Sequence, residues 1–535
     1  MTTADFIVVG AGSSGCVLAN RLSENPANRV LLIEAGPRDR HPFVPIPFMT
    51  RLLFTMKLLN WGYDTEAQDN LAGRSIHWPR GKLLGGSSSI NGMTFIRGLP
   101  SDFDGWRQAG AEGWSYEDVL PYFKRMETHP TKRSAYRGTD GPLRVTEARR
   151  DGALNEAFLA AGMEAGFPAT DDFNGASQEG FGIHDFTIER ARRQSTSRAY
   201  LAPVRDRANL EIVTDALVRR LVFEGRRVVG VEYDRFGESQ TIRAAREVIV
   251  SAGAVNSPVL LMLSGIGPAD ALRRVGIPVV YDAPEVGENL QDHLGVYSSF
   301  ECLQPVSLNF LMRPDQAALA FLRAALLRSG PGAQIPIQGC AFLKTRDDLD
   351  APDVQVSLVP GLLNRIVALR PKHGFLIHAY QLRPRSRGRV ALTSSNPLEK
   401  PRIEPNYLSD AEDLVTLRRA LRLVRRIAHQ PAFDPYRGTP IAPAADIESD
   451  EAMDDWIRGN ASTAYHPVGT CRMGSDPGAV VNSDLRVRGV ENLRVADASV
   501  MPAITSGNTN APSIMIGEKA ADLVLGRAPL PRVSL

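Results

Sequence analysis

The sequence is poor in cysteine and in long apolar runs, and its charge is nearly balanced. Its four cysteines lie far apart without a Cys-x-x-Cys pair, so we expect reduced thiols rather than a disulfide framework or a zinc site: Cys16, Cys302, Cys340 and Cys471. No histidine or cysteine spacing fits a metal site. The 62 basic against 60 acidic residues give no reason to expect a nucleic acid as partner.

No apolar run approaches the ~18–20 residues that span a bilayer, so no transmembrane segment is expected. A strand pattern begins at Asp5, which leaves no room for a signal peptide in the chain as given. A cytoplasmic protein is therefore the expectation. With 43% hydrophobic and 23% charged residues among 535, the composition is that of a globular chain of two or three domains.

A glycine fingerprint lies inside the first β-α-β pattern. Residues 6–9 and 30–34 read as parallel strands around a helix at 16–22, and the second strand ends in an acid. Gly10 permits the tight turn, Gly12 lets the backbone approach a pyrophosphate, and Gly15 lets helix and sheet pack closely. The helix N-terminus favours the negative charge of that pyrophosphate. Glu34 would bind the adenosine ribose.

Later segments predict the rest of the fold. Residues 246–251 and 493–497 read as strands of the same sheet, and residues 210–250 alternate as in a meander or hairpins. Between 300 and 460, alternating runs mix with helices, which is typical of an antiparallel sheet with helices on one side. The expected fold class is α/β, a Rossmann-like parallel sheet that is discontinuous in sequence plus an α+β domain.

Two stretches are unusually apolar. Residues 43–60 fit a lid over the site or a piece of core. Residues 316–327 fit a membrane-facing amphipathic helix or core, and we expect core.

Five further motifs occur in a fixed order: a glycine–serine loop at 81–93, residues 253–267, an Asn-Leu-Gln-Asp-His run at 289–293, the His466 motif and residues 497–510. Together with the fingerprint they closely resemble the glucose–methanol–choline oxidoreductases, above all the bacterial branch similar to choline and alcohol dehydrogenases. The resemblance covers nearly the whole chain. It implies an FAD-binding domain from residues 1–155, 196–300 and 460–535, and a substrate-binding domain from residues 156–195 and 301–459.

The resemblance also implies which residues bind FAD. Some relatives hold the flavin covalently through a histidine just before the asparagine of the glycine–serine loop. Here that position is Ile90, so we expect non-covalent FAD. The residues expected around the cofactor are Gly10, Gly12, Ser14, Gly15, Glu34, Ala35, Gly85, Gly86, Ser87, Asn91, Gly92, Met93, Val218, Ala252, Asp497, Ala498, Asn508 and Thr509.

Two residues are expected to be catalytic. The oxidation of an alcohol needs a base near the hydroxyl, and imidazole suits this role because its pKa lies near neutrality. His466 matches the family's histidine, and Asn510 is expected to hydrogen-bond the substrate oxygen beside it. His293 is interpreted as structural, capping a turn near the cofactor.

The function implied is oxidation of a primary alcohol to the aldehyde, with hydride transfer to flavin N5. Electrons would pass to a quinone or carrier, which is favoured, or to O2, and a quinone would bring peripheral contact with the inner face of the membrane. Choline would need an anionic or aromatic cage that the sequence does not reveal, so an aliphatic or aromatic alcohol fits at least as well.

Other activities known on the same scaffold are the rival interpretations. The main alternative is a flavoprotein lyase similar to hydroxynitrile lyases, which the residues do not distinguish. Photodecarboxylases lack the histidine at the position of His466. An NAD-dependent enzyme is disfavoured, because the glycine–serine loop and the C-terminal segment do not resemble that class.

Overall fold

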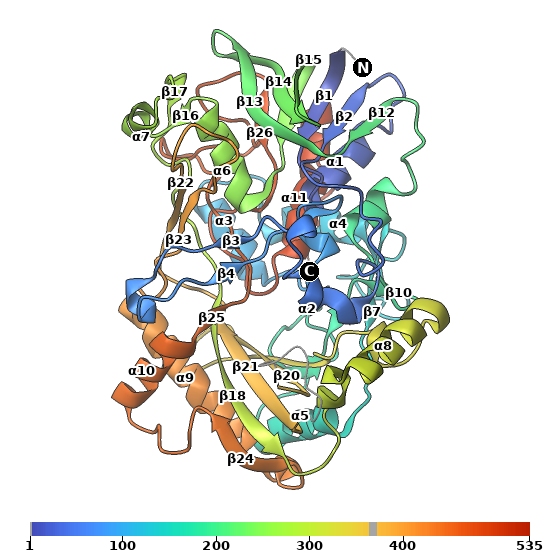
Figure 1. Cartoon of the computed structure of the whole chain (residues 1–535), viewed down its shortest axis with the longest axis vertical. Coiled ribbons are helices and arrows are strands. Elements are labelled where there is room, and N and C mark those ends of the chain that lie inside the picture. Colours follow the sequence, from blue (N-terminus) through green and yellow to red (C-terminus); the bar gives the residue numbers. More distant parts are fainter. Residues whose placement is uncertain (1–2, 363–371, 535) are drawn as a thin grey trace.

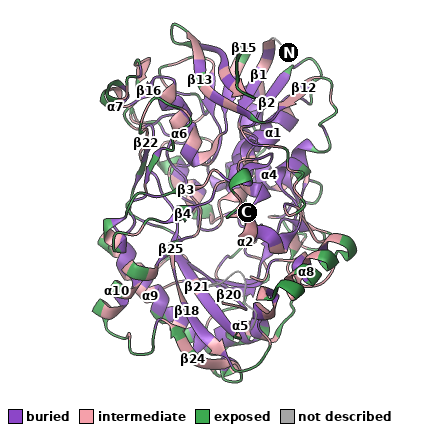
Figure 2. Ribbon diagram, in the orientation of Figure 1, coloured by how far each residue is buried: buried purple, intermediate pink, exposed green. Residues whose placement is uncertain are grey.

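The computed structural model describes residues 3–362 and 372–534. Two large sheets organise the chain, one near each end of the molecule as drawn in Figure 1. Their strands are mostly buried (Figure 2), and two large apolar clusters form their cores. The α/β expectation is confirmed in both parts, a sheet with a parallel half and an antiparallel sheet with helices.

The first sheet has seven strands in the order β12-β2-β1-β15-β14-β13, with β26 beside β15. Strands β12, β2, β1, β15 and β26 run parallel, whereas β13, β14 and β15 form an antiparallel meander. The meander predicted for residues 210–250 is confirmed from residue 216 on, whereas residues 210–213 form β12, which pairs in parallel with β2. Its strands are β1 (Thr3–Val9), β2 (Val30–Ile33), β12 (Leu210–Val213), β13 (Ala216–Glu224), β14 (Arg227–Arg235), β15 (Glu238–Val250) and β26 (Leu493–Val495).

The two ends of the chain meet beside this sheet. Helix α1 (Ser13–Leu22) packs against α11 (Asn510–Leu525), although about 500 residues separate them. A Cβ on Gly517 would lie 2.9 Å from the Cα of Ser14, so glycine is what allows this close approach. Helices α4 (Tyr116–Met126) and α6 (Gly253–Leu263) also lie in this part, and α4 contacts α11. This part of the fold is therefore discontinuous in sequence, as expected.

The second sheet is antiparallel, in the order β24-β18-β21-β20-β19-β8, with β25 beside β18. Helix α9 (Ala411–Ala428) covers it with an apolar face, because Leu414, Leu417, Leu421 and Val424 recur at helical spacing and are buried. Its strands are β8 (Gly180–Ile183), β18 (Leu294–Cys302), β19 (Gly339–Leu343), β20 (Val354–Val359), β21 (Gly374–Gln381), β24 (Arg437–Ala442) and β25 (Ser462–Thr463). Strand β18 crosses the boundary expected at 300, and β25 belongs to this sheet although it lies beyond the boundary expected at 460, so the domain limits stay a prediction.

The remaining helices surround these sheets: α2 (Thr50–Leu53), α3 (Pro100–Gln108), α5 (Ala153–Glu164), α7 (Ala269–Arg274), α8 (Pro314–Leu322) and α10 (Asp450–Asn460). The expectation that residues 316–327 form core is wrong. Helix α8 buries only its small side chains and exposes its leucines, because a nine-residue helix on the rim of the molecule has a partner on one side only.

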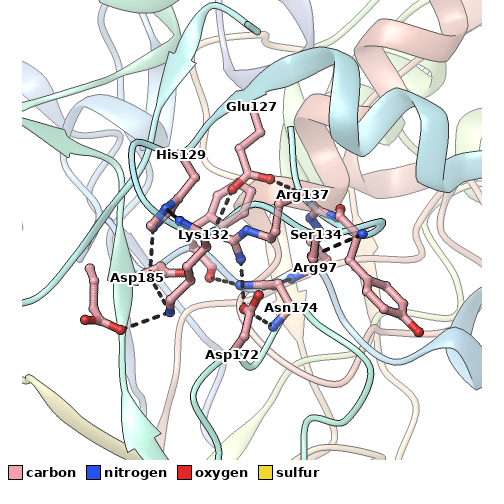
Figure 3. A network of polar contacts seen from close by, with 12 residues as sticks. Arg97, Glu127, His129, Lys132, Ser134, Arg137, Asp172, Asn174 and Asp185 are labelled. Carbon is pink, nitrogen blue, oxygen red and sulfur yellow. Dashed lines mark hydrogen bonds and ion pairs between the residues drawn. The ribbon is translucent and has the colours of Figure 1, made fainter. Parts of the chain in front are cut away.

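A buried ion network joins segments near residues 97, 127–137 and 172–185 (Figure 3). Arg137 binds Glu127 and Asp185 at 2.7 Å each and Asp172 at 3.0 Å. Arg97 pairs with Glu127, and both are fully buried. Each deep charge thus has an opposite charge as partner, which burial demands.

Three of the expected absences concern disulfides, metal sites and membrane-spanning helices. All four cysteines are free and buried. Over residues 3–362 and 372–534 no cluster of three metal-ligating side chains is found. In the same ranges no helix is both long and apolar enough to cross a membrane.

Candidate active site

A cavity of about 1460 Å³ extends between the two sheets. Its walls combine the fingerprint after β1, the glycine–serine loop, the start of α11 and one face of β18, β20 and β21. Of the twenty residues expected in the site, all but Gly15 and Gly85 line it. The structure thus brings together motifs that span almost the whole sequence.

Gly15 and Gly85 shape the backbone behind the wall. A Cβ on Gly15 would lie 1.9 Å from the carbonyl oxygen of Gly10, so any side chain would force α1 away from the strand. Gly85 has a φ of +86° and donates its N–H to the Ala11 carbonyl at 2.8 Å. These contacts hold the two glycine loops against each other.

Glu34 lies at one end of the cavity. Its carboxylate accepts the N–H groups of Ala11 and Gly36 at 2.9 Å each. Burial raises its pKa to about 7, although both backbone donors favour the charged form. The group therefore fixes the turn of the fingerprint and remains on the cavity wall, where the predicted ribose would lie.

Two helix N-termini point their free N–H groups toward the cavity. Neither Gly12 at the start of α1 nor Thr509 at the start of α11 caps its helix through a side chain. Uncapped N–H groups bind anions and carbonyl oxygens. Asp497 accepts the N–H of Gly253 at 2.8 Å and also the Ser257 hydroxyl. This part of the wall consists of glycine backbone, two helix N-termini and Glu34, the acid predicted to bind the ribose. These features fit FAD.

His466 lies in the middle of the cavity wall. Its Nε2 is 3.0 Å from Nδ2 of Asn508, and its Nδ1 is 3.0 Å from Nδ1 of His293. The sequence placed Asn510 in the first of these positions. Instead the Asn510 side chain accepts the Ser13 hydroxyl at 2.7 Å, because Asn510 is the first residue of α11 and faces α1.

The hydrogen bonds fix the tautomer of His466. Nε2 of His293 is 3.1 Å from the Leu382 carbonyl, so this nitrogen must carry the proton. Nδ1 of His293 is then an acceptor, and Nδ1 of His466 must donate to it. Nε2 of His466 is left unprotonated toward Asn508 and the cavity. His293 thus orients the predicted base, and the turn-capping role expected for it is wrong.

Electrostatics keep this base neutral. Burial, then His293 and Arg80, hold the pKa of His466 well below its ordinary value. Asp292 fixes the backbone, since it accepts the His466 N–H at 2.7 Å. Arg80 donates to the carbonyl of Tyr465 at 2.8 Å, and Tyr465 itself has a φ of +66°. The histidine is therefore held on both flanks.

Strand alternation supplies the wall facing His466. In β20 the side chains of Gln355, Ser357 and Val359 line the cavity, while the residues between them are buried in the core. In β21 His378 and Tyr380 do the same. Sequence reasoning gave these residues no role, although the polar residues in the 354–359 alternation were a usable signal.

This wall is polar without being charged. Burial lowers the pKa of His184 to about 3 and that of His378 to about 4, so both are neutral at ordinary pH. The Nε2 of Gln355 lies 3.5 Å from Oδ1 of Asn508. Among the described lining residues the only carboxylates are Glu34, Asp497 and Glu399, and four are cationic: Arg51, Arg80, Lys82 and Lys400.

Comparison with known proteins identifies relatives over the whole length. Two family models, both described as GMC oxidoreductase, match residues 4–295 and 384–517. The chain is 47% identical to an oxygen-dependent choline dehydrogenase of Brucella suis, covering 99% of this chain and 97% of that protein. It is 46% identical to one of Photobacterium profundum, covering 99% and 94%.

Solved structures agree. Pyridoxine 4-oxidase from Mesorbium loti superposes with a TM-score of 0.89 at 33% identity, over 98% of this chain and all of that one. A variant of Aspergillus oryzae formate oxidase gives a TM-score of 0.92 at 27% identity, over 98% of each chain.

Proposed function

The chain belongs to the GMC oxidoreductase family and carries out FAD-dependent alcohol oxidation, and on this premise we propose that it oxidises an uncharged primary alcohol to the aldehyde with His466 as base. The observation that carries the proposal is the pair formed by Nε2 of His466 and the amide of Asn508 at the cavity wall. FAD, when bound, accepts the hydride that leaves the alcohol carbon.

His466 takes the hydroxyl proton. Its Nε2 carries the lone pair, because Nδ1 donates to His293. A lowered pKa keeps the ring neutral and therefore able to act as a base at ordinary pH. The proton moves from the substrate oxygen to Nε2 as the carbon loses its hydride.

Asn508 positions the substrate oxygen. Its Nδ2 has two N–H groups, so one can hold the oxygen while the other faces His466. Gln355, close to the Asn508 carbonyl, helps to fix the amide orientation. We assign to Asn508 the role first expected for Asn510, whose bond to Ser13 leaves it beside the fingerprint instead.

The cavity charges favour an uncharged substrate. The three described lining carboxylates are already engaged or peripheral: Glu34 and Asp497 bind backbone N–H groups, and Glu399 lies on an exposed loop. Lys400 lies on the same exposed loop as Glu399, but three other cationic side chains line the cavity: Arg51, Arg80 and Lys82. A quaternary ammonium would meet like charge without a counter-ion, which a buried charge requires.

Seven described aromatic side chains line the cavity, and the indole, which is the strongest cation–π partner among them, is already engaged: Phe48, Phe54, Trp61, Tyr63, Tyr297, Tyr380 and Tyr465. Trp61 also lines the cavity, but Nζ of Lys82 lies 4.7 Å from its ring centroid. The ring that would attract a ligand cation already has a cation as partner. We therefore propose that choline, the substrate named for the Brucella relative, is a poor substrate here.

The test is anaerobic flavin reduction with choline and with its uncharged isostere, in which carbon replaces the nitrogen. The two molecules have the same shape, so their ratio of kcat/KM reports charge alone. We expect the neutral alcohol to be preferred by about tenfold or more. Preference for choline would refute the substrate class but not alcohol oxidation. No bleaching with any primary alcohol would refute the oxidation itself and would direct attention to cyanohydrins.

Electrons are proposed to leave through a quinone or carrier rather than O2. Admission of air to the reduced enzyme tests this. Slow recolouring, accelerated by a soluble quinone, is the expected result, whereas rapid recolouring with peroxide would mean an oxidase.

A further inference from the structure

The outer face of α8 is an apolar surface without a partner among the described residues. Ten large hydrophobic side chains of the described chain are exposed, and four of them lie within nine residues. The exposed fractions are 50% for Leu319, 50% for Leu322, 76% for Leu326 and 70% for Leu327. Single exposed leucines are common, but a cluster of this kind marks an interaction surface.

Helical geometry places three of these leucines on one stripe. Helix α8 continues into a π-helical turn, η7 (Arg323–Leu327), so the segment is helical over 314–327. Leu319, Leu322 and Leu326 are spaced by three and four residues and therefore share a face. Ala320 and Ala324 lie on the opposite face and are buried. We call residues 319, 322 and 326 the leucine stripe; exposed α8 stands out in Figure 2.

Basic residues flank the leucine stripe. Arg313, Arg323 and Arg328 are exposed, and the only acid between 313 and 328, Asp315, pairs with Arg313 at 2.8 Å. Arg192 donates to the Ala325 carbonyl at 2.6 Å. Burial lowers the pKa of Arg192, and the neighbouring Arg328 and Arg198 lower it further. With Arg313 and Arg323, five arginines therefore lie in this region.

We propose that the leucine stripe docks on an anionic lipid surface. Its leucines would enter the boundary between headgroups and acyl chains, and the arginines would meet lipid phosphates. Charge distinguishes this partner from a second copy of the chain. A two-fold interface would place like arginines against each other, whereas an anionic bilayer neutralises them.

The position of α8 connects docking with the cavity. Pro314 and Ala317 line the cavity, and Phe321 makes an edge-to-face contact at 5.4 Å with Phe43 at the start of the apolar 43–60 stretch. A bilayer on the leucine stripe would lie beside this cavity wall. Apolar substrates or a lipid-soluble acceptor could then enter from the membrane.

Vesicle flotation of the purified full-length holoenzyme tests the proposal without measuring activity. One set of vesicles contains phosphatidylcholine alone, and the other an equal mixture with phosphatidylglycerol. We expect flotation with the anionic set, reduced by salt, and far less with the neutral set. Failure of the unmodified protein to float with anionic vesicles would overturn the proposal.

Two variants locate the surface. Leu322→Asp with Leu326→Asp should lower the bound fraction at least about tenfold. Arg323→Glu with Arg328→Glu keeps the leucines and should abolish the preference for anionic lipid. Phe236→Asp is the matched control, because Phe236 is 78% exposed at the β14–β15 turn, remote from α8 (Figure 1).

Flavin content and melting temperature confirm that each variant is folded. A double leucine variant that floats like the unmodified protein would overturn the assignment. The proposal would also be overturned if the unmodified protein did not float and formed a dimer that only the leucine variant dissociates into monomers.

Discussion

The active-site histidines and the ion network of Figure 3 are buried to similar depth, yet the histidines are neutral whereas the groups of the network are charged. His184, His293 and His378 have no charged partner that outweighs desolvation, so burial pushes their pKa values down and leaves them neutral. In the network, the hydrogen bond with His129 and then the charges of Arg137 and Lys132 lower the pKa of Asp185 despite its burial. The supply of opposite charge, rather than depth, decides which groups ionise.

The difference matches the two tasks. A base must be neutral before it can accept a proton, and burial, His293 and Arg80 together keep His466 neutral. Segments that meet from distant parts of the chain can instead be fixed by permanent charge pairs, as Arg137 does with Asp172 and Asp185. Four predictions test this difference between the neutral active site and the charged network.

The largest effect is expected from His466→Ala. Removal of the base should lower the rate of flavin reduction by about 10²–10⁴-fold, while FAD stays bound because the histidine acts mainly in the transition state. Stopped-flow absorbance with a saturating alcohol measures the rate. Loss of the flavin, or near-normal turnover, would contradict the assigned role.

Arg137→Met should destabilise the protein by about 3–5 kcal/mol, since it leaves the buried Glu127 and Asp185 and the half-buried Asp172 with fewer counter-charges. Denaturant unfolding followed by fluorescence reports the change. Arg313→Met is the control, because its pair with Asp315 is exposed and screened by solvent, so its loss should lower the stability far less. Equal losses in the two variants would remove the distinction between buried and exposed pairs.

Asn508→Ala should slow flavin reduction by about 10–100-fold, because the substrate oxygen and His466 both lose a donor. Asn510→Ala is the matched comparison two residues away. It should affect FAD affinity more than the reduction rate, since Asn510 binds Ser13 of α1. The reverse ranking in single-turnover experiments would restore the role first expected for Asn510.

The most gradual effect is a dependence of stability on pH. Burial lowers the pKa of His184 and of His293 from 6.5 to about 3, so the unfolded state binds more protons below pH 6.5. Stability should therefore fall as pH drops from 6.5 toward 3, by about 1.4 kcal/mol per pH unit for each histidine. Denaturation midpoints measured between about pH 7.5 and about pH 5 give the slope. His184→Gln should make it shallower, and an unchanged slope would show that this histidine is not held neutral.

Much of the fold could be predicted because its signals are local. The β-α-β unit follows from glycines at positions 10, 12 and 15 and from apolar strands, and the meander over 216–250 follows from alternation in that stretch. The exposed α8 was misjudged, because a run of alanines and leucines looks alike whether its leucines face core or solvent. Only packing decides which side of such a helix has a partner.

The order of motifs, the glycine loops and the identity of His466 could be predicted from the amino-acid sequence alone, since each depends on residue types at short spacings. Only the tertiary structure decided that Asn508 rather than Asn510 reaches this histidine, and that His293, 173 residues earlier, sets its tautomer. The charge of the substrate pocket was decided in the same way. Hydrogen bonds and fields depend on distances in space, which contacts between remote segments fix and local spacing does not.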